Sequence, residues 1–414
     1  MDKQLIGPFR QIITMDGLKA KGPVADEQIQ TIAEAGVGVA DGKILEVGEW
    51  NTLRKNKDYN PVGVEDDWVL LPGMIDAHTH ICFAGSRVND YAMRVAGKSY
   101  LEIAAAGGGI WTSVTHTRAA DVAELTSLTR KRALRLLQDG VTTVEVKSGY
   151  GLNVESEIRM LEAIRNTGEQ EPIDTIATCL AAHIRPRDFG GSQEEYLEMV
   201  LRELLPRVKH RNLARRVDIF VEESAFSPQA AEPFLREVLR MGFDITIHAD
   251  QFSTGASELG VKLGVRSLDH LEASGEKEIA MIGRSDCVAV VLPGASLGLG
   301  MHFAPARKLL DAGACLAIAS DWNPGSAPMG DLLMQAAVLG AAEKLSVAET
   351  LAGVTCRAAM ALGLSDRGVI APGMKADMIA FPTRDFRDIF YFQGKMKPGK
   401  IWKNGIQMIP VYMG

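Results

Sequence analysis

The chain has 414 residues, of which 46% are hydrophobic and 23% are charged, and its formal net charge at pH 7 is −7. This composition is typical of a globular protein with a large core. The acidic balance and the dispersed basic residues argue against a nucleic-acid partner, because proteins that bind nucleic acids present a surplus of basic residues. No apolar run approaches the roughly 18 residues that a membrane-spanning helix needs, so we expect no membrane segment.

Five cysteines are scattered along the chain, and none stands in C-x-x-C spacing. An odd number without regular spacing favours free thiols over a disulfide framework or a cysteine zinc site. The first residues, Met1–Gln4, lack the basic and apolar stretches of a secretory signal. Together these features predict a cytoplasmic location.

Both ends of the chain are predicted to form short strands. Val37–Val47 contains two extended runs joined by an Asp-Gly turn, and Ile401–Met408 contains a second hairpin around Asn-Gly. Neither end holds enough strands for a stable sheet by itself. We therefore expect residues 1–68 and 365–414 to combine into one small composite β-sandwich domain.

Residues 69–364 alternate short apolar strands with amphipathic helical stretches, such as Val122–Asp139 and Pro228–Met241. Eight strand candidates follow one another along this region: Gly73–His80, Thr142–Val146, Asp174–Ala182, Arg216–Val221, Asp244–His248, Ser267–His270, Cys287–Leu292 and Cys315–Ser320. Eight strands alternating with helices predict an α/β fold, specifically a TIM (β/α)8 barrel. A doubly wound open sheet is the alternative, but no G-x-G-x-x-G follows the first strand.

Metal-ligating residue types gather at the carboxyl ends of these strands, where TIM barrels place their catalytic residues. The first strand ends in His78 and His80, which an extended chain points to the same side. The later strand ends carry the other candidates: His183, His248, His270 and Asp321. Because the whole chain has only eight histidines, this clustering favours one common site over unrelated core histidines.

Three imidazoles and a carboxylate leave a position for water on a bound ion, as a catalytic metal site requires. His78, His80, His248 and Asp321 would supply this set. A bound divalent ion lowers the pKa of its water to about 7, and Asp321 could accept the proton of the attacking water. His270 could donate a hydrogen bond to a carbonyl oxygen as negative charge develops there.

The H-x-H of the first strand, the later histidines and the aspartate resemble the amidohydrolase superfamily of metal-dependent hydrolases. Two segments are more specific and resemble the imidazolonepropionase family, namely Lys147–Leu152 and the Asp-x-Asn-Pro-Gly-Ser pattern of Asp321–Ser326. The likeness extends over nearly the whole chain. It implies hydrolysis of the cyclic amide C–N bond of 4-imidazolone-5-propionate to N-formimino-L-glutamate, a step of histidine degradation.

The resemblance also implies roles for individual residues. It implies one metal ion, zinc or iron, and a small-molecule substrate with a carboxylate tail that an arginine could bind through two hydrogen bonds. The metal ligands would be His78, His80, His248 and Asp321, the catalytic residues His270 and Asp321, and the substrate-binding residues Arg87, Tyr150, His183, Asn323, Gly325 and Ser326. The family resemblance further implies a homodimer.

Gln251 stands where some family members and many related deaminases have a glutamate, three residues after the histidine of the fifth strand. A glutamine cannot ionise, so this position argues against a deaminase. Asp321 would then move the proton, with Asp250 or a glutamate of strand 4, Glu222 or Glu223, as possible helpers.

Trp322 and the stretch that follows Pro293 also differ from the family pattern, so a related ring could be the substrate. Two alternatives to the cyclic-amide hydrolase therefore stay open. One is an amidohydrolase or aminohydrolase acting on another small nitrogen heterocycle. The other is a catalytically inactive barrel used for binding.

Overall fold

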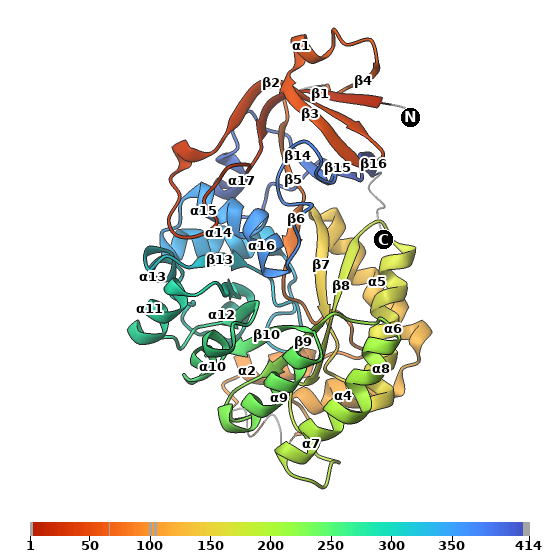
Figure 1. The fold of residues 1–414 in the computed structure, drawn as a ribbon, viewed down its shortest axis with the longest axis vertical. Coiled ribbons are helices and arrows are strands. Elements are labelled where there is room, and N and C mark those ends of the chain that lie inside the picture. The colour runs from red at the N-terminus through yellow and green to blue at the C-terminus, as the bar shows by residue number, and fades with distance from the viewer. Residues whose placement is uncertain (1–2, 66, 99–101, 103–105, 409–414) are drawn as a thin grey trace.

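A computed structural model describes residues 3–65, 67–98, 102 and 106–408. Two eight-stranded sheets organise this part of the chain (Figure 1). One sheet has the order β13-β12-β11-β10-β9-β8-β7-β6, in which every neighbouring pair is parallel. The other sheet is mixed and lies beside it. The predicted α/β barrel with a separate sheet of end strands is confirmed.

The barrel strands lie where the alternating pattern predicted them: β8 and β11 have the predicted bounds, β7 and β10 are slightly longer, and the other four are shorter. Their bounds are β6 (Met74–Asp76), β7 (Val141–Lys147), β8 (Asp174–Ala182), β9 (Arg216–Phe220), β10 (Asp244–Ala249), β11 (Ser267–His270), β12 (Val288–Val291) and β13 (Cys315–Ile318). All seven residues of β7 are buried, as expected for a parallel strand covered on both faces.

Helices between these strands begin at polar residues that cap them. Asp121, Asn153 and Ser227 each accept a hydrogen bond from a backbone amide in the first turn of the helix that follows. The three helices are α5 (Val122–Gln138), α6 (Val154–Gln170) and α9 (Pro228–Arg240). Figure 1 shows α5 and α6 side by side along the outside of the barrel.

The barrel closes between its first and last strands just beyond the carboxyl ends of β6 and β13. There Thr79 and Trp322 form a parallel bridge. The amide of Asp321 donates to the carbonyl of His78 over 3.1 Å, and the amide of His80 donates to the carbonyl of Trp322 over 2.9 Å. The closure therefore places three of the four predicted metal ligands, His78, His80 and Asp321, on adjacent backbone segments.

Strands from both chain ends form the second sheet, where the red and blue segments lie together (Figure 1). Its strands are β1 (Lys3–Ile13), β2 (Thr31–Ala40), β3 (Lys43–Glu49), β4 (Tyr59–Gly63), β5 (Val69–Pro72), β14 (Met378–Phe381), β15 (Lys400–Lys403) and β16 (Ile406–Met408). β5 joins the two ends, because it pairs with β1 on one side and β14 on the other.

This sheet has a hydrophobic core of its own, which includes Phe9, Val37 and Trp402. The domain division at residues 68 and 365 stays a prediction, and residues 409–414, the end of the expected composite domain, lie outside the described residues. All five cysteines are free. In the described ranges, no helix combines the length and the apolar character needed to cross a membrane.

Candidate metal centre

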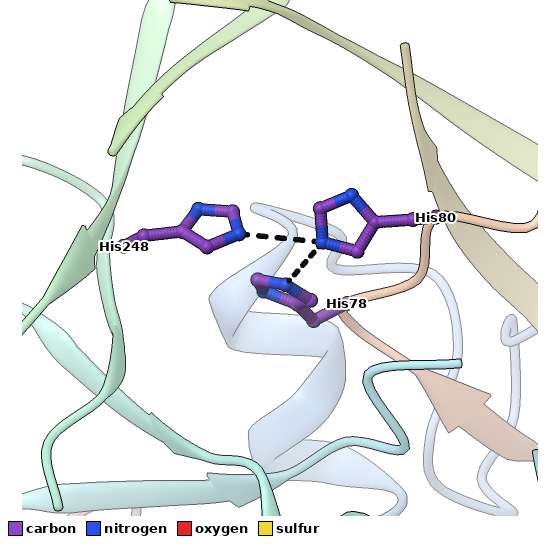
Figure 2. A group of neighbouring side chains, drawn as sticks. All are labelled: His78, His80 and His248. Atoms are coloured by element: carbon purple, nitrogen blue, oxygen red, sulfur yellow. Dashed lines mark hydrogen bonds between the residues drawn. The ribbon is translucent and has the colours of Figure 1, made fainter. Parts of the chain in front are cut away.

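The side chains of His78, His80 and His248 converge at the carboxyl end of the barrel (Figure 2). Nε2 of His80 lies 3.2 Å from Nε2 of His78 and 3.3 Å from Nε2 of His248. All three rings are buried. Within the described part of the chain, no other group of three potential ligands comes this close. Three imidazole nitrogens pointing at one place are typical of a site for a transition-metal ion.

The carboxylate of Asp321 completes the predicted set. Its Oδ1 lies 3.5 Å from Nε2 of His78 and 3.4 Å from Nε2 of His80. Burial alone would raise the pKa of Asp321, but hydrogen bonding and charge from the two histidines hold this pKa well below its usual range. The carboxylate of Asp321 is therefore ionised, the form in which a carboxylate binds a metal ion.

The protonation states of His80 and His248 suit the binding of a cation, and that of His78 would have to change. Burial lowers the pKa of His80 and holds that of His248 well below the usual value, so both rings are neutral at pH 7. For His78, burial and Lys147 disfavour the charge, yet Asp269 and Asp321 outweigh them and raise its pKa to about 9. A metal ion at Nε2 of His78 would take the place of that proton, since ligating imidazoles bind in their neutral form.

Buried carboxylates contact two of these rings at Nδ1, the nitrogen that faces away from the cluster. Nδ1 of His78 lies 2.6 Å from Oδ2 of Asp269, and Nδ1 of His248 lies 3.0 Å from Oδ2 of Asp218. A carboxylate that accepts from Nδ1 fixes the tautomer and turns Nε2 toward the metal position. We did not predict Asp218 or Asp269 as functional, although charged residues inside otherwise apolar strands were a signal for them.

The backbone is unusual at the ends of three strands. Asp250, His270 and Asp321 have positive φ angles of 51°, 88° and 51°. Residues other than glycine seldom adopt this region, and such conformations cluster at functional sites where the surrounding structure holds them. Two of the three, His270 and Asp321, are predicted site residues, and the third, Asp250, was weighed as a proton carrier.

His183 and Tyr150, both predicted to contact substrate, lie beside His80. The ring of His183 stacks on that of His80 with centroids 5.4 Å apart, and the Tyr150 ring lies 6.1 Å from it. Nδ1 of His183 faces the carbonyl oxygen of Gly149 at 3.0 Å. Burial, helped by His80, lowers the pKa of His183 to about 3. Its Nε2 therefore carries a free lone pair that could accept a hydrogen bond.

A cavity of about 380 Å³ contains three more of the predicted substrate-binding residues, Arg87, Asn323 and Gly325, together with Arg132 and Trp322. Nε of Arg87 donates to Asp90 over 2.8 Å, which fixes the guanidinium. A Cβ on Gly325 would come within 2.3 Å of Nη1 of Arg87. Only a glycine at this position lets the guanidinium pack against the turn.

Comparisons with known proteins place this geometry in a family. The sequence pattern of the amidohydrolase family matches residues 69–407. An imidazolonepropionase from Deinococcus deserti is 37% identical over 409 residues, which cover 99% of this chain and 100% of that protein. Another, from Shewanella halifaxensis, is 38% identical and covers 92% of this chain and 95% of that protein. The chain belongs to the amidohydrolase family, among its imidazolonepropionases.

Solved structures also match the fold of this chain, at lower sequence identity. Atrazine chlorohydrolase from Arthrobacter aurescens TC1, complexed with zinc, gives a TM-score of 0.69 at 17% identity and covers 98% of this chain and 95% of its own. An adenosine deaminase from Xanthomonas campestris with bound zinc gives 0.71 at 18% identity, covering 98% and 92%. These likenesses concern the fold. Family membership and the three-histidine cluster support a divalent metal ion in this amidohydrolase.

His270, the predicted partner of the substrate carbonyl, lies next to the cluster in this amidohydrolase. Its ring centroid is 5.3 Å from that of His248 and 5.9 Å from that of His78. Nδ1 of His270 lies 3.4 Å from Glu272, whose other oxygen accepts from Ser296 over 3.1 Å. Glu272 was not predicted, although a carboxylate two residues after a strand-end histidine was the available signal.

The other acidic side chains weighed as proton carriers hold the loop after β10 instead. Asp250 accepts from the amide of Ser257 and the hydroxyl of Ser274. Glu222 accepts from the amides of Phe252 and Ser253 at 2.9 and 3.1 Å. Asp321, in contrast, lies beside Nε2 of His78 and of His80.

Proposed function

We propose that this protein hydrolyses the cyclic amide bond of 4-imidazolone-5-propionate, giving N-formimino-L-glutamate in histidine degradation. One observation carries the proposal: the nitrogens of His78, His80 and His248 converge beside Asp321, in a chain 37% identical to an imidazolonepropionase over almost its full length. Opening a cyclic amide requires an activated water, charge stabilisation at the carbonyl oxygen and a proton carrier. The buried cluster offers residues for each task.

The proposed metal ligands are His78, His80, His248 and Asp321, and the proposed ion is zinc or iron, because imidazole and carboxylate ligands suit both. When bound, such an ion polarises a carbonyl and lowers the pKa of water to about 7. The burial of all four side chains supports the proposal, since buried ligands exclude competing water.

Asp321 is the proposed proton carrier. It takes a proton from the attacking water while the water oxygen bonds to the ring carbonyl carbon, and then gives that proton to the ring nitrogen as the C–N bond breaks. Asn323 keeps the carboxylate in place through a 2.9 Å hydrogen bond to Oδ2. His270, with Glu272 beside its Nδ1, is the proposed donor to the carbonyl oxygen as negative charge grows there.

Substrate binding is proposed for the residues of the cavity and the rings beside it. Arg87 would bind the propionate carboxylate through its terminal nitrogens, because its Nε is already directed to Asp90. The remaining contacts to the ring or its tail are proposed for Tyr150, His183, Asn323, Gly325 and Ser326. Tyr150 remains a neutral donor, since burial raises the pKa of its hydroxyl above the usual value.

We also propose a homodimer, on the family resemblance alone, and a cytoplasmic location. The five free cysteines support the second of these, because thiols stay reduced in that compartment.

The test is turnover by the purified protein. We expect loss of 4-imidazolone-5-propionate with formation of N-formimino-glutamate, abolished by a chelator and restored by zinc or iron. Failure to turn over this substrate with metal confirmed in the protein would contradict the assignment. Ammonia released from a heterocyclic amine would favour the aminohydrolase, and elemental analysis without metal would favour the inactive barrel.

A further inference from the structure

Lys147, the last residue of β7, is buried inside the barrel directly behind the histidines, with 1% of its side chain exposed. Its ammonium nitrogen lies 2.9 Å from Glu145 Oε1, 2.9 Å from Asp218 Oδ2 and 3.9 Å from Asp269 Oδ2. Buried charges of this kind need partners. One lysine therefore holds together three carboxylates that come from β7, β9 and β11.

Each of these carboxylates also contacts a segment that carries a proposed ligand. Asp218 faces Nδ1 of His248 at 3.0 Å, and Asp269 faces Nδ1 of His78 at 2.6 Å. Glu145 accepts from the backbone amide of Thr79, the residue between His78 and His80, over 3.2 Å. Through three acidic side chains, a single ammonium is thus connected to every histidine of the cluster.

We propose that Lys147 is the positioning residue of the metal centre. Its ammonium fixes the places of Glu145, Asp218 and Asp269, and these fix the directions of the three ligating histidines. The proposal rests on the proposed metal site and deepens it, since Lys147 itself touches neither the ion position nor the substrate cavity. Partners that orient metal-bound histidines commonly change metal affinity by about 10- to 100-fold when they are removed.

Lys403 provides a matched comparison. Its side chain is 3% exposed, and its nitrogen lies 2.6 Å from Asp377 and 3.1 Å from Asp174. It belongs to β15, in the sheet of end strands, and contacts no histidine of the cluster in the described structure. Replacing either lysine with methionine removes a buried ammonium from buried or half-buried carboxylates. Of the two lysines, only Lys147 lies next to the carboxylates that contact the histidine cluster.

The experiment compares Lys147→Met and Lys403→Met with the wild type. Metal-free proteins are titrated with zinc against a coloured chelator, and the visible spectrum of the Co²⁺-loaded proteins reports ligand geometry. We expect Lys147→Met to weaken zinc affinity by about 10- to 100-fold and to alter the Co²⁺ spectrum. Lys403→Met should keep the wild-type affinity and spectrum even where its melting temperature falls.

A Lys147→Met protein with wild-type zinc affinity and Co²⁺ spectrum would overturn the proposal. If Lys147→Met does not fold, Lys147→Arg replaces it, because arginine retains the charge but moves the three carboxylates apart. Weaker zinc binding and an altered spectrum are expected from this variant as well, and wild-type values would again overturn the proposal. If the wild-type protein binds neither zinc nor Co²⁺, the metal site itself is contradicted. Equal binding by the wild type and the Lys147 variant contradicts only the role proposed for Lys147.

Discussion

The side-chain nitrogen of Asn323 donates a hydrogen bond to the carboxylate of Asp321 over 2.9 Å and contacts the carbonyl oxygen of the same residue at 2.7 Å. The amide oxygen of Asn323 accepts from the backbone amides of Gly325 and Ser326 at 2.7 and 2.8 Å. Asn323 therefore shapes the turn after the last barrel strand and aims the proposed proton carrier.

Asn323→Ala should lower kcat much more than it raises KM, because a misplaced proton carrier slows chemistry without removing the proposed carboxylate-binding site. The expected loss in kcat is about 100-fold, the size of effect that a displacement near 1 Å can cause. Steady-state kinetics on the metal-loaded protein measures both values. A raised KM with unchanged kcat would instead support the direct substrate contact predicted for Asn323.

Arg87→Ala should raise KM for a substrate with a carboxylate tail by about 10- to 100-fold, the usual range for hydrogen bonds to a charged group. The kcat value should change little. Arg202→Ala removes an exposed arginine that pairs with Glu198, four residues earlier, and serves as the control. An analogue without the carboxylate should bind both proteins equally, and an unchanged KM in Arg87→Ala would contradict the proposed tail site.

Removal of the metal should lower the melting temperature, because an ion that binds only the folded state stabilises it by about 4 kcal/mol at 1,000 times its Kd. Adding a chelator to wild type should therefore lower the melting temperature, and zinc should restore it. His248→Ala should lose most of this response. His210→Ala, which changes an exposed histidine away from the cluster, should retain it, and equal responses from the two variants would argue against His248 as a ligand.

Asp174 makes stability depend on pH. It lies at the start of β8 and contacts Arg367, Lys375 and Lys403. Burial opposes its charge, yet the three cations hold the pKa of Asp174 well below its usual range. Because the folded pKa is depressed, this stabilisation is present above the unfolded value near 3.9 and is lost as the pH falls further.

Asp174→Asn should therefore be less stable than wild type by about 2 kcal/mol at pH 7, with a difference that shrinks as the pH drops below 4. Urea unfolding of both proteins at pH 7 and at pH 3 tests this directly. A gap that stays constant over this range would show that the carboxylate charge does not contribute to folding.

The sequence predicted the barrel and the histidine cluster for clear physical reasons. Apolar strands such as β12 stand out between the helices, and parallel strands bring their carboxyl ends to one rim. His78, His248 and Asp321 could therefore be placed together from their positions alone. The predicted and observed strands begin at the same residues, Ser267 for β11 and Cys315 for β13, which reflects the same strong pattern.

The layer behind the histidines could not be predicted in the same way. Asp218 stands in a strand that the sequence pattern assigns to a hydrophobic core, and Lys147 directly follows the predicted strand Thr142–Val146. Only the three-dimensional arrangement shows that the two side chains face each other. The direction of the Asn323 amide was equally hidden, because a residue near a cavity can face the ligand or its own backbone. Side-chain direction in a turn depends on φ and ψ values, such as the positive φ of Asp321, that composition does not reveal.

The bridge between Thr79 and Trp322 has a consequence for how the protein is made. The first two proposed ligands are synthesised early, but the strand that closes the barrel and the aspartate beside it come more than two hundred residues later. A nascent chain on the ribosome therefore cannot assemble the full donor set until Asp321 has been added and β13 has docked beside β6. The complete donor set proposed for the metal therefore exists only in chains whose translation has passed the last barrel strand.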